Sequence, residues 1–154
     1  MSFWKTTRRA VLASAALLLT VGGVSAASPT MPENNRETIA QYFSLVDVAG
    51  KSAVSFDELI SLYADTAEVY SNDGSVSHGK EELRKNTQAF YQGMTGGESR
   101  HFYQIIECSG DTAEVDWAVA AKMPDGNVLA LQGHNTYRFD ANHKIVYLLV
   151  RNRS

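Results

Sequence analysis

Apolar residues follow a mainly helical spacing in the first half of this chain and a strand spacing in the second half, and this order limits the folds open to it. Between residues 36 and 91 apolar side chains recur at helical spacing, as in Ile39, Tyr42, Phe43 and Val46. From Arg100 to Val150 four strand-length segments follow, separated by short polar turns. Helices followed by an antiparallel meander are typical of α+β domains, in which helices cover one face of a strongly bent sheet.

The first residues carry the features of a secretory signal peptide. Lys5, Arg8 and Arg9 precede the apolar run Ala10–Val21, and Val24-Ser25-Ala26 offers the small residues that a signal peptidase requires. The run is shorter than the about 20 apolar residues that a spanning helix needs. We therefore expect cleavage after Ala26, a periplasmic or secreted protein, and no stable membrane insertion after cleavage.

The export route stays open at this point. Thr7-Arg8-Arg9-Ala10-Val11-Leu12 is similar to the twin-arginine consensus, while ordinary Sec export fits the same residues. Residues 1–26 would then be the signal peptide and residues 27–35, with Pro29 and Pro32, a flexible lead-in. Residues 36–154 have the size of one domain.

Composition excludes some classes of partner and site. The formal net charge is −3, and removal of the signal peptide makes it three units more negative. An acidic chain argues against nucleic-acid binding, which depends on clustered Lys and Arg. Cys108 is the single cysteine, so no intrachain disulfide is possible. The His, Cys, Asp and Glu residues do not show metal-ligand spacing, so we expect neither a metal nor a cofactor.

Local signals set the expected boundaries of the helices. Asn34 with Glu37, and Ser55 with Glu58, are typical of helix starts. The second helix is expected to carry an apolar stripe that ends at Tyr63. A short strand from Ala67 to Tyr70 and the turn Ser71-Asn72-Asp73-Gly74 predict a hairpin, and a third helix should run from Gly79 to Tyr91.

One amide interrupts an apolar row in the third strand of the meander. Leu131 and Tyr137 share a side with Asn135. A buried amide that lacks a partner costs about 1–3 kcal/mol. We therefore expect Asn135 to contact either a neighbouring hydroxyl or a ligand, and Leu131 and Tyr137 to line the ligand site.

Several motifs resemble the nuclear transport factor 2-like superfamily, within it the ketosteroid isomerases and SnoaL-like cyclases. Tyr42-Phe43-Ser44-Leu45-Val46-Asp47 is similar to the first helix of the isomerases, and Arg138-Phe139-Asp140 to their motif after the third meander strand. The resemblance implies a cone-shaped, curved antiparallel sheet with three N-terminal helices packed on its concave face. It also implies a homodimer and a cavity for a small hydrophobic molecule.

The resemblance further implies roles for single residues. Tyr42 matches the tyrosine that donates a hydrogen bond to the substrate oxygen, and Asn135 stands where the isomerases carry a second donor. Tyr63 and Tyr91 match the tyrosines behind Tyr42. Ser71 occupies the position of the general base, and a serine hydroxyl does not accept a proton at neutral pH without a helper.

The missing base leaves several interpretations open. Asp73 or His101 could move the proton, although Asp73 lies in a sequence that favours a solvated turn. Tyr42 and Asn135 would then polarise a carbonyl or hydroxyl oxygen of the substrate in an isomerase or cyclase reaction. Alternatively the same donors orient a ligand without catalysis, or side chains fill the cavity and the domain serves only for dimerisation.

Overall fold

The computed structural model describes residues 31–153, so the predicted signal peptide and residues 27–30 of the predicted lead-in lie outside the described residues. The elements follow the order helix, helix, two strands, helix and four strands. They are α1 (Glu33–Val46), α2 (Ala53–Ser61), β1 (Tyr63–Tyr70), β2 (Val76–His78), α3 (Lys80–Gly93), β3 (Glu98–Ser109), β4 (Thr112–Lys122), β5 (Val128–Phe139) and β6 (Ile145–Arg153). This confirms the α+β class and the four-stranded meander.

One six-stranded sheet contains all the strands, in the order β2-β1-β6-β5-β4-β3. All neighbouring pairs are antiparallel except β1 and β6, which run parallel. The parallel pair departs from the fully antiparallel sheet expected from the sequence. It arises because β6 inserts between β1 and β5, so the last strand pairs with the first.

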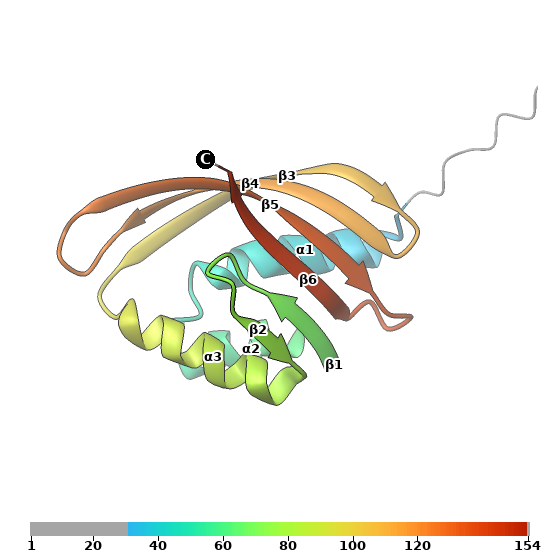
Figure 1. Ribbon diagram of the computed structural model, residues 1–154, viewed down its shortest axis with the longest axis horizontal. Coiled ribbons are helices and arrows are strands. Elements are labelled where there is room, and N and C mark those ends of the chain that lie inside the picture. Colours follow the sequence, from blue (N-terminus) through green and yellow to red (C-terminus); the bar gives the residue numbers. More distant parts are fainter. Residues whose placement is uncertain (1–30, 154) are drawn as a thin grey trace, which may run out of the picture.

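The sheet bends strongly, and its long strands β3–β6 arch over α1, while α2 and α3 lie beside β1 and β2 (Figure 1). Apolar side chains from α1, α2 and the concave face form the core. Eight of its apolar residues are at most 1 % exposed: Ile39, Ile60, Ala67, Ala113, Val115, Tyr137, Ile145 and Leu148. Ala113 and Val115 of β4 lie at alternate, inward-facing positions, as β periodicity requires. Ile145 and Leu148 of β6 are three residues apart, because the register between β5 and β6 shifts by one residue at Phe139.

Helix ends differ in detail from the sequence signals. Helix α1 begins at Glu33 after Pro32, so Asn34, the expected start, lies within the helix and does not cap it. The cap of α2 is Ser52, whose Oγ accepts a hydrogen bond from the backbone N–H of Ser55 at 3.1 Å. Ser55, the expected start, thus lies three residues after the observed cap. It is the residue whose backbone N–H is capped, and Ser52 supplies the capping hydroxyl.

Tyr63 also lies outside the helix in which its apolar spacing placed it. Helix α2 ends at Ser61 with Leu62 as its C-cap, and Tyr63 is the first residue of β1. Tyr63 is paired with Ile145 of β6, and the backbone N–H of Ile145 donates to the carbonyl of Leu62 at 2.9 Å. Pairing with the last strand therefore overrides the local helical pattern.

Glycine is required where β2 turns into α3. Gly79 has φ +84°, and a Cβ there would lie 3.2 Å from the carbonyl oxygen of Asp65. The carboxylate of Glu82 closes the helix start by accepting from the backbone N–H of His78 at 2.8 Å. In the part of the chain that the structure describes, no helix is long and apolar enough to cross a membrane.

Candidate functional site

The pairing register orders the concave side of β3, β4 and β5 into rows that cross the sheet. Each row holds one residue from each strand, and successive rows lie two residues apart, or about 7 Å. Three rows concern the site, and we name them inner, middle and outer. The inner row is Ile105, Val115 and Asn135, the middle row is Tyr103, Trp117 and Gly133, and the outer row is His101, Val119 and Leu131.

Asn135 of the inner row is the centre of a buried hydrogen-bond cluster. It is 1 % exposed. Its Oδ1 accepts from Trp117 Nε1 at 2.8 Å, and its Nδ2 donates to Tyr137 Oη at 2.9 Å. Tyr42 of α1 also hydrogen-bonds to Asn135, and its ring packs edge-on against Tyr137 at 5.7 Å. We call these four residues the inner cluster.

The phenols of the inner cluster are held in the neutral form. Burial raises the pKa of Tyr42 to about 12, although its hydrogen bond with Asn135 acts in the opposite direction. Burial likewise raises the pKa of Tyr137 well above its ordinary value. Tyr42 and Asn135 lie close together in the structure, and the amide of Asn135 is engaged by protein groups on both its oxygen and its nitrogen.

The indole of Trp117 lies between the other three residues of the inner cluster and the outer row. A Cβ at Gly133 would lie 2.2 Å from Cζ2 of Trp117, so the ring rests directly on the glycine backbone. Trp117 is 8 % exposed. Because the middle row stands between the other two, the indole separates Asn135 from the residues at the outer end of the sheet.

His101 of the outer row forms a dyad with Asp47, the residue that follows α1. Oδ1 of Asp47 lies 2.6 Å from His101 Nδ1 and accepts from Ser99 Oγ at 2.8 Å, while Oδ2 accepts from the backbone N–H of His101 at 2.8 Å. The side chains of His101 and Asp47 are 20 % and 18 % exposed. Of the three groups facing the carboxylate, the backbone N–H can only donate, and the Ser99 hydroxyl and His101 Nδ1 act as donors here because a carboxylate only accepts.

This arrangement assigns the tautomer of His101. A carboxylate is an acceptor, so Nδ1 must carry the proton that it shares with Asp47. In the neutral imidazole, Nε2 then carries the lone pair. Among residues 31–153 no hydrogen-bond partner is found for His101 Nε2.

Apolar and aromatic side chains surround the dyad. The ring centroids of Phe43 and Trp117 each lie 6.1 Å from that of His101. Tyr103 stacks on Phe43 at 4.5 Å and is 40 % exposed, as is Leu129 beyond the outer row. In Figure 1 the hairpin that joins β4 to β5 projects past α1.

The remaining predicted site residues lie elsewhere. Asp73 lies in the exposed β1–β2 turn, where its Oδ1 accepts from the backbone N–H of Ser75 at 2.9 Å, and hydrogen bonding to Ser75 lowers its pKa. Ser71 begins the same turn, with its backbone N–H bonded to the carbonyl of Ser75. Tyr91 donates its hydroxyl to the backbone carbonyl of Val46 at 2.9 Å, and so fixes α3 to α1.

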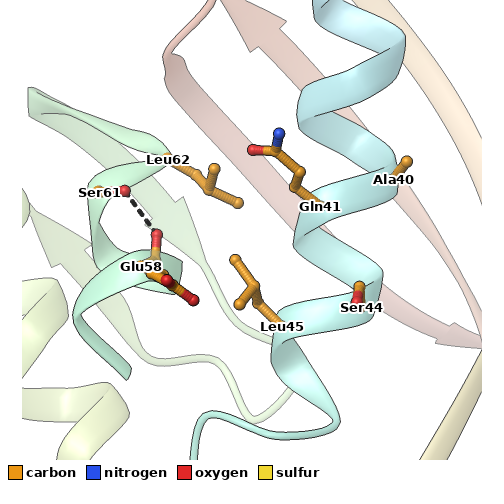
Figure 2. Close-up of a pocket in the computed structure, with 7 residues that line it drawn as sticks. All are labelled: Ala40, Gln41, Ser44, Leu45, Glu58, Ser61 and Leu62. Carbon is orange, nitrogen blue, oxygen red and sulfur yellow. Dashed lines mark hydrogen bonds between the residues drawn. The ribbon is translucent and has the colours of Figure 1, made fainter. Parts of the chain in front are cut away.

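Two surface hollows accompany these groups, and neither is lined by the predicted site residues. The larger, of about 570 Å³, lies between α1 and α2 and is lined by Ala40, Gln41, Ser44, Leu45, Glu58, Ser61 and Leu62. Figure 2 shows Gln41, Leu45 and Leu62 pointing into the space between the helices. Glu58 is the one ionisable residue of this lining, so the hollow offers no acid–base pair. The other, of about 300 Å³, lies beside Asn35 and His143.

Sequence reasoning missed Asp47, Ser99 and the covering role of Trp117. Asp47 and His101 are far apart in the chain. No local sequence pattern connects the end of helix α1 with the start of strand β3. Trp117 lies on the inward face of β4, in line with the alternating burial of that strand. In the described part of the chain, no group of three or more His, Cys, Asp or Glu residues could hold a metal ion.

Comparison with known proteins identifies the family to which this fold belongs. The family model of the SnoaL-like domain matches residues 39–148. An NTF2-like protein of unknown function from Exiguobacterium sp. 255-15 is 31 % identical, with a TM-score of 0.66, and the match covers 76 % of this chain and 98 % of that one. No curated protein matches this chain.

Two more distant structures share the fold. A protein from Silicibacter sp. TM1040 assigned as a polyketide cyclase is 14 % identical, with a TM-score of 0.63, over 79 % of this chain and 90 % of its own. Another protein so assigned, from Xanthomonas campestris pv. campestris, is 13 % identical, with a TM-score of 0.59, over 79 % and 91 %. With its family match and its bent sheet over N-terminal helices, this chain belongs to the SnoaL-like family of the nuclear transport factor 2-like superfamily.

Proposed function

We propose that this domain binds a small apolar carbonyl or hydroxyl compound at the outer end of its concave face, and that His101 moves a proton on it without a cofactor. The observation that carries this proposal is the Asp47–His101 dyad, in which the carboxylate fixes the imidazole with its Nε2 lone pair available. A nitrogen base oriented by a carboxylate is the arrangement that general-base catalysis uses. The SnoaL-like fold supports a ligand-binding or cyclase-type domain.

The proton transfer would proceed as follows. His101 Nε2 takes a proton from a carbon next to the carbonyl, and the electron pair of the broken C–H bond moves to give an enolate. Returning the proton to another carbon yields an isomer, so no oxidant or reductant is needed. Tyr103 lies two residues away on the same face of β3, and its hydroxyl would stabilise the enolate oxygen.

Deuterium exchange tests the role of His101. The full-length protein in D₂O with 2-cyclohexen-1-one should exchange the protons next to the carbonyl, as followed by proton NMR. His101→Gln should abolish the exchange that exceeds the buffer rate. Asp73→Asn is the matched control, because Asp73 is the other candidate base but lies in an exposed turn. Exchange that survives His101→Gln and disappears in Asp73→Asn would reverse the assignment.

A non-catalytic binding domain is the second candidate, and the inner cluster favours it. Asn135 is engaged by Trp117 and Tyr137, so the donors that the isomerases present to substrate are used within the protein. Perturbation of the His101 imidazole signals by the enone, with no exchange above the buffer rate, would select this function. Loss of that perturbation in Leu131→Asp would place the ligand on the outer row.

We further propose a homodimer formed through the convex face of the sheet. Phe102, 58 % exposed, lies on this face opposite Ala118. Light scattering during size-exclusion chromatography should show a dimer that Phe102→Glu converts to a monomer. Val128→Glu, at an exposed position in the β4–β5 hairpin, is the control that should leave the dimer intact. A monomeric wild-type protein would refute the proposal.

Export to the periplasm or beyond remains a proposal that rests on residues 1–26. Mass spectrometry of the exported protein should find a chain that begins at Ala27. Replacing Arg8 and Arg9 together by lysine should block twin-arginine export and leave Sec export working. A protein recovered with residues 1–26 intact in the cytoplasmic fraction would contradict the proposal.

A further inference from the structure

We propose that the smaller hollow, at the start of α1, is a second ligand site, and that it binds a small molecule whose apolar body carries a primary ammonium and a hydroxyl group. The hollow has a volume of about 300 Å³. It lies at the opposite end of α1 from the Asp47–His101 dyad, about 20 Å away along a helix of 14 residues. The inference therefore goes beyond the proposed function and does not depend on it.

Three segments that are remote in the sequence form this hollow. They are the start of α1, the turn between β3 and β4, and the turn between β5 and β6. Pro32, Phe139 and Ala141 are the apolar residues of its lining, and the polar groups belong to Asn35, Asp111, Asp140 and His143. The volume is at the lower end of the range for small-molecule sites.

Asn35 supplies a hydrogen-bond donor that the protein does not use. The residue is 2 % exposed, and its Oδ1 lies 2.8 Å from His143 Nδ1. Among residues 31–153 no partner is found for Asn35 Nδ2, yet every fully enclosed side-chain nitrogen or oxygen of this region has one. Nδ2 is therefore not enclosed. Because Asn35 is otherwise buried and lines the hollow, its NH₂ group faces the hollow.

His143 is held beside this amide. Its φ of 62° lies in the left-handed region, which is uncommon for a residue other than glycine. Thr38 Oγ1 donates to the backbone carbonyl of His143 at 3.0 Å. An amide oxygen only accepts, so His143 Nδ1 carries the proton that it shares with Asn35, and Nε2 of the neutral imidazole carries the lone pair. In the described part of the chain, no partner is found for this Nε2.

The hollow also carries negative charge. Asp111 and Asp140 belong to its lining, which contains neither Lys nor Arg. Within residues 31–153 no ion pair of either carboxylate is found. Oδ1 of Asp140 accepts from the backbone N–H groups of Asn142 and Lys144 at 2.8 and 2.9 Å, which leaves Oδ2 for a ligand. Nζ of Lys144 donates to the carbonyl of Ser61 at 2.6 Å, so this cation is engaged elsewhere.

These groups define the chemistry of the ligand. A primary ammonium is attracted by the two carboxylates and has three N–H groups to donate. A hydroxyl group can accept from Asn35 Nδ2 and donate to His143 Nε2, so it satisfies both free groups at once. The apolar lining favours a small ring as the body of the molecule. The compound 2-amino-1-phenylethanol combines the three features and is the probe.

Titration of the full-length protein with this amino alcohol, followed by two-dimensional NMR, tests the site. The amino alcohol should shift the imidazole signals of His143 and the side-chain NH₂ signals of Asn35. These signals are assigned by their loss in His143→Asn, which suits a left-handed φ, and in Asn35→Asp. We expect 1-phenyl-1,2-ethanediol, which lacks the charge, and phenethylamine, which lacks the hydroxyl, each to bind about ten-fold more weakly. Equal affinity for the amino alcohol and the diol would refute an ammonium site.

Asp111→Asn tests the contribution of charge, because it removes one carboxylate with little change in size. It should weaken binding of the amino alcohol about three-fold and leave binding of the diol unchanged. Asp125→Asn is the matched control, since it removes the same charge in the β4–β5 turn, where the carboxylate is bonded to Asn127. An equal effect of the two variants would show that only the overall charge matters, and would refute the site.

The variant His101→Gln separates this inference from the proposed function. It should abolish enone exchange and leave the affinity for the amino alcohol unchanged. Loss of amino-alcohol binding in this variant would place the compound at the Asp47–His101 dyad and refute a second site. Enone exchange that survives His101→Gln would refute the proposed function, while the shifts of Asn35 and His143 still report on the hollow.

Discussion

Replacing Asp47 by asparagine should invert the tautomer of His101 while it keeps the shape of the site. An asparagine has one oxygen, and the backbone N–H of His101 needs that acceptor. The amide NH₂ then faces His101 Nδ1, which must offer a lone pair and moves its proton to Nε2. The proposed base is thereby lost although every heavy atom stays in place.

The cost in stability follows from the contacts. Asp47 makes three hydrogen bonds, to Ser99 Oγ, the His101 backbone and His101 Nδ1. Exchanging a charged for a neutral acceptor costs about 1 kcal/mol for each bond. The partial exposure of both side chains reduces this total, so we expect a loss of about 2 kcal/mol. For a domain of this size that lowers the melting temperature by about 8 °C.

Two-dimensional nitrogen–proton NMR of the imidazole reads the tautomer directly, at a pH where His101 is neutral. Wild type should show the proton on Nδ1 and Asp47→Asn the proton on Nε2, with enone exchange lost in the variant. Asp57→Asn is the control, because its ion pair with Arg84 is exposed and should shift the melting temperature by no more than about 2 °C. A wild-type His101 with its proton on Nε2 would refute the assignment.

Three further predictions concern the hydrogen-bond clusters. Asn135→Leu leaves Trp117 Nε1 without its acceptor, and should cost about 3 kcal/mol in urea unfolding; a loss below about 1 kcal/mol would mean that the cluster contributes little. Tyr42 has a pKa raised from 10.0 to about 12, so the stability it gives is complete below pH 10 and lost as the pH rises through 12. Wild type should thus lose more stability than Tyr42→Phe over that interval, and parallel alkaline unfolding curves would contradict this. The pKa of Asp116 is lowered, chiefly by its hydrogen bond with His134, so its contribution is present above pH 3.8 and lost below it. The stability difference between wild type and Asp116→Asn should therefore shrink from pH 6 to pH 3, and a constant difference would exclude this cause.

Much of the architecture could be predicted because it depends on short-range patterns. The four strand-length segments separated by polar turns correspond to strands β3 to β6, and the alternating burial of β4 accounts for Trp117 in the core. Local signals were weaker where long-range pairing competes with them. Tyr63 has helical spacing, yet its pairing with Ile145 of β6 makes it a strand residue.

The candidate site could be predicted only in part. The sequence marked Asn135 as an amide in an apolar row, and a neighbouring hydroxyl, Tyr137, does satisfy it. The sequence also offered His101 among the candidate bases. It could not link His101 to Asp47, because this contact joins residues from two elements that only the tertiary fold brings together.

The sequence by itself determined the class of the fold and the inward-facing residues, since both follow from the periods of helix and strand and from the need to bury apolar surface. The tertiary structure decided which polar groups are bonded within the protein and which can contact a ligand. The register of three strands sets His101 and Asn135 two rows apart, and the indole of Trp117 fills the place between them. A hydrogen bond forms only when its donor and acceptor are placed to within a few tenths of an ångström. Between segments that are remote in sequence, only the packing of the folded chain gives this precision.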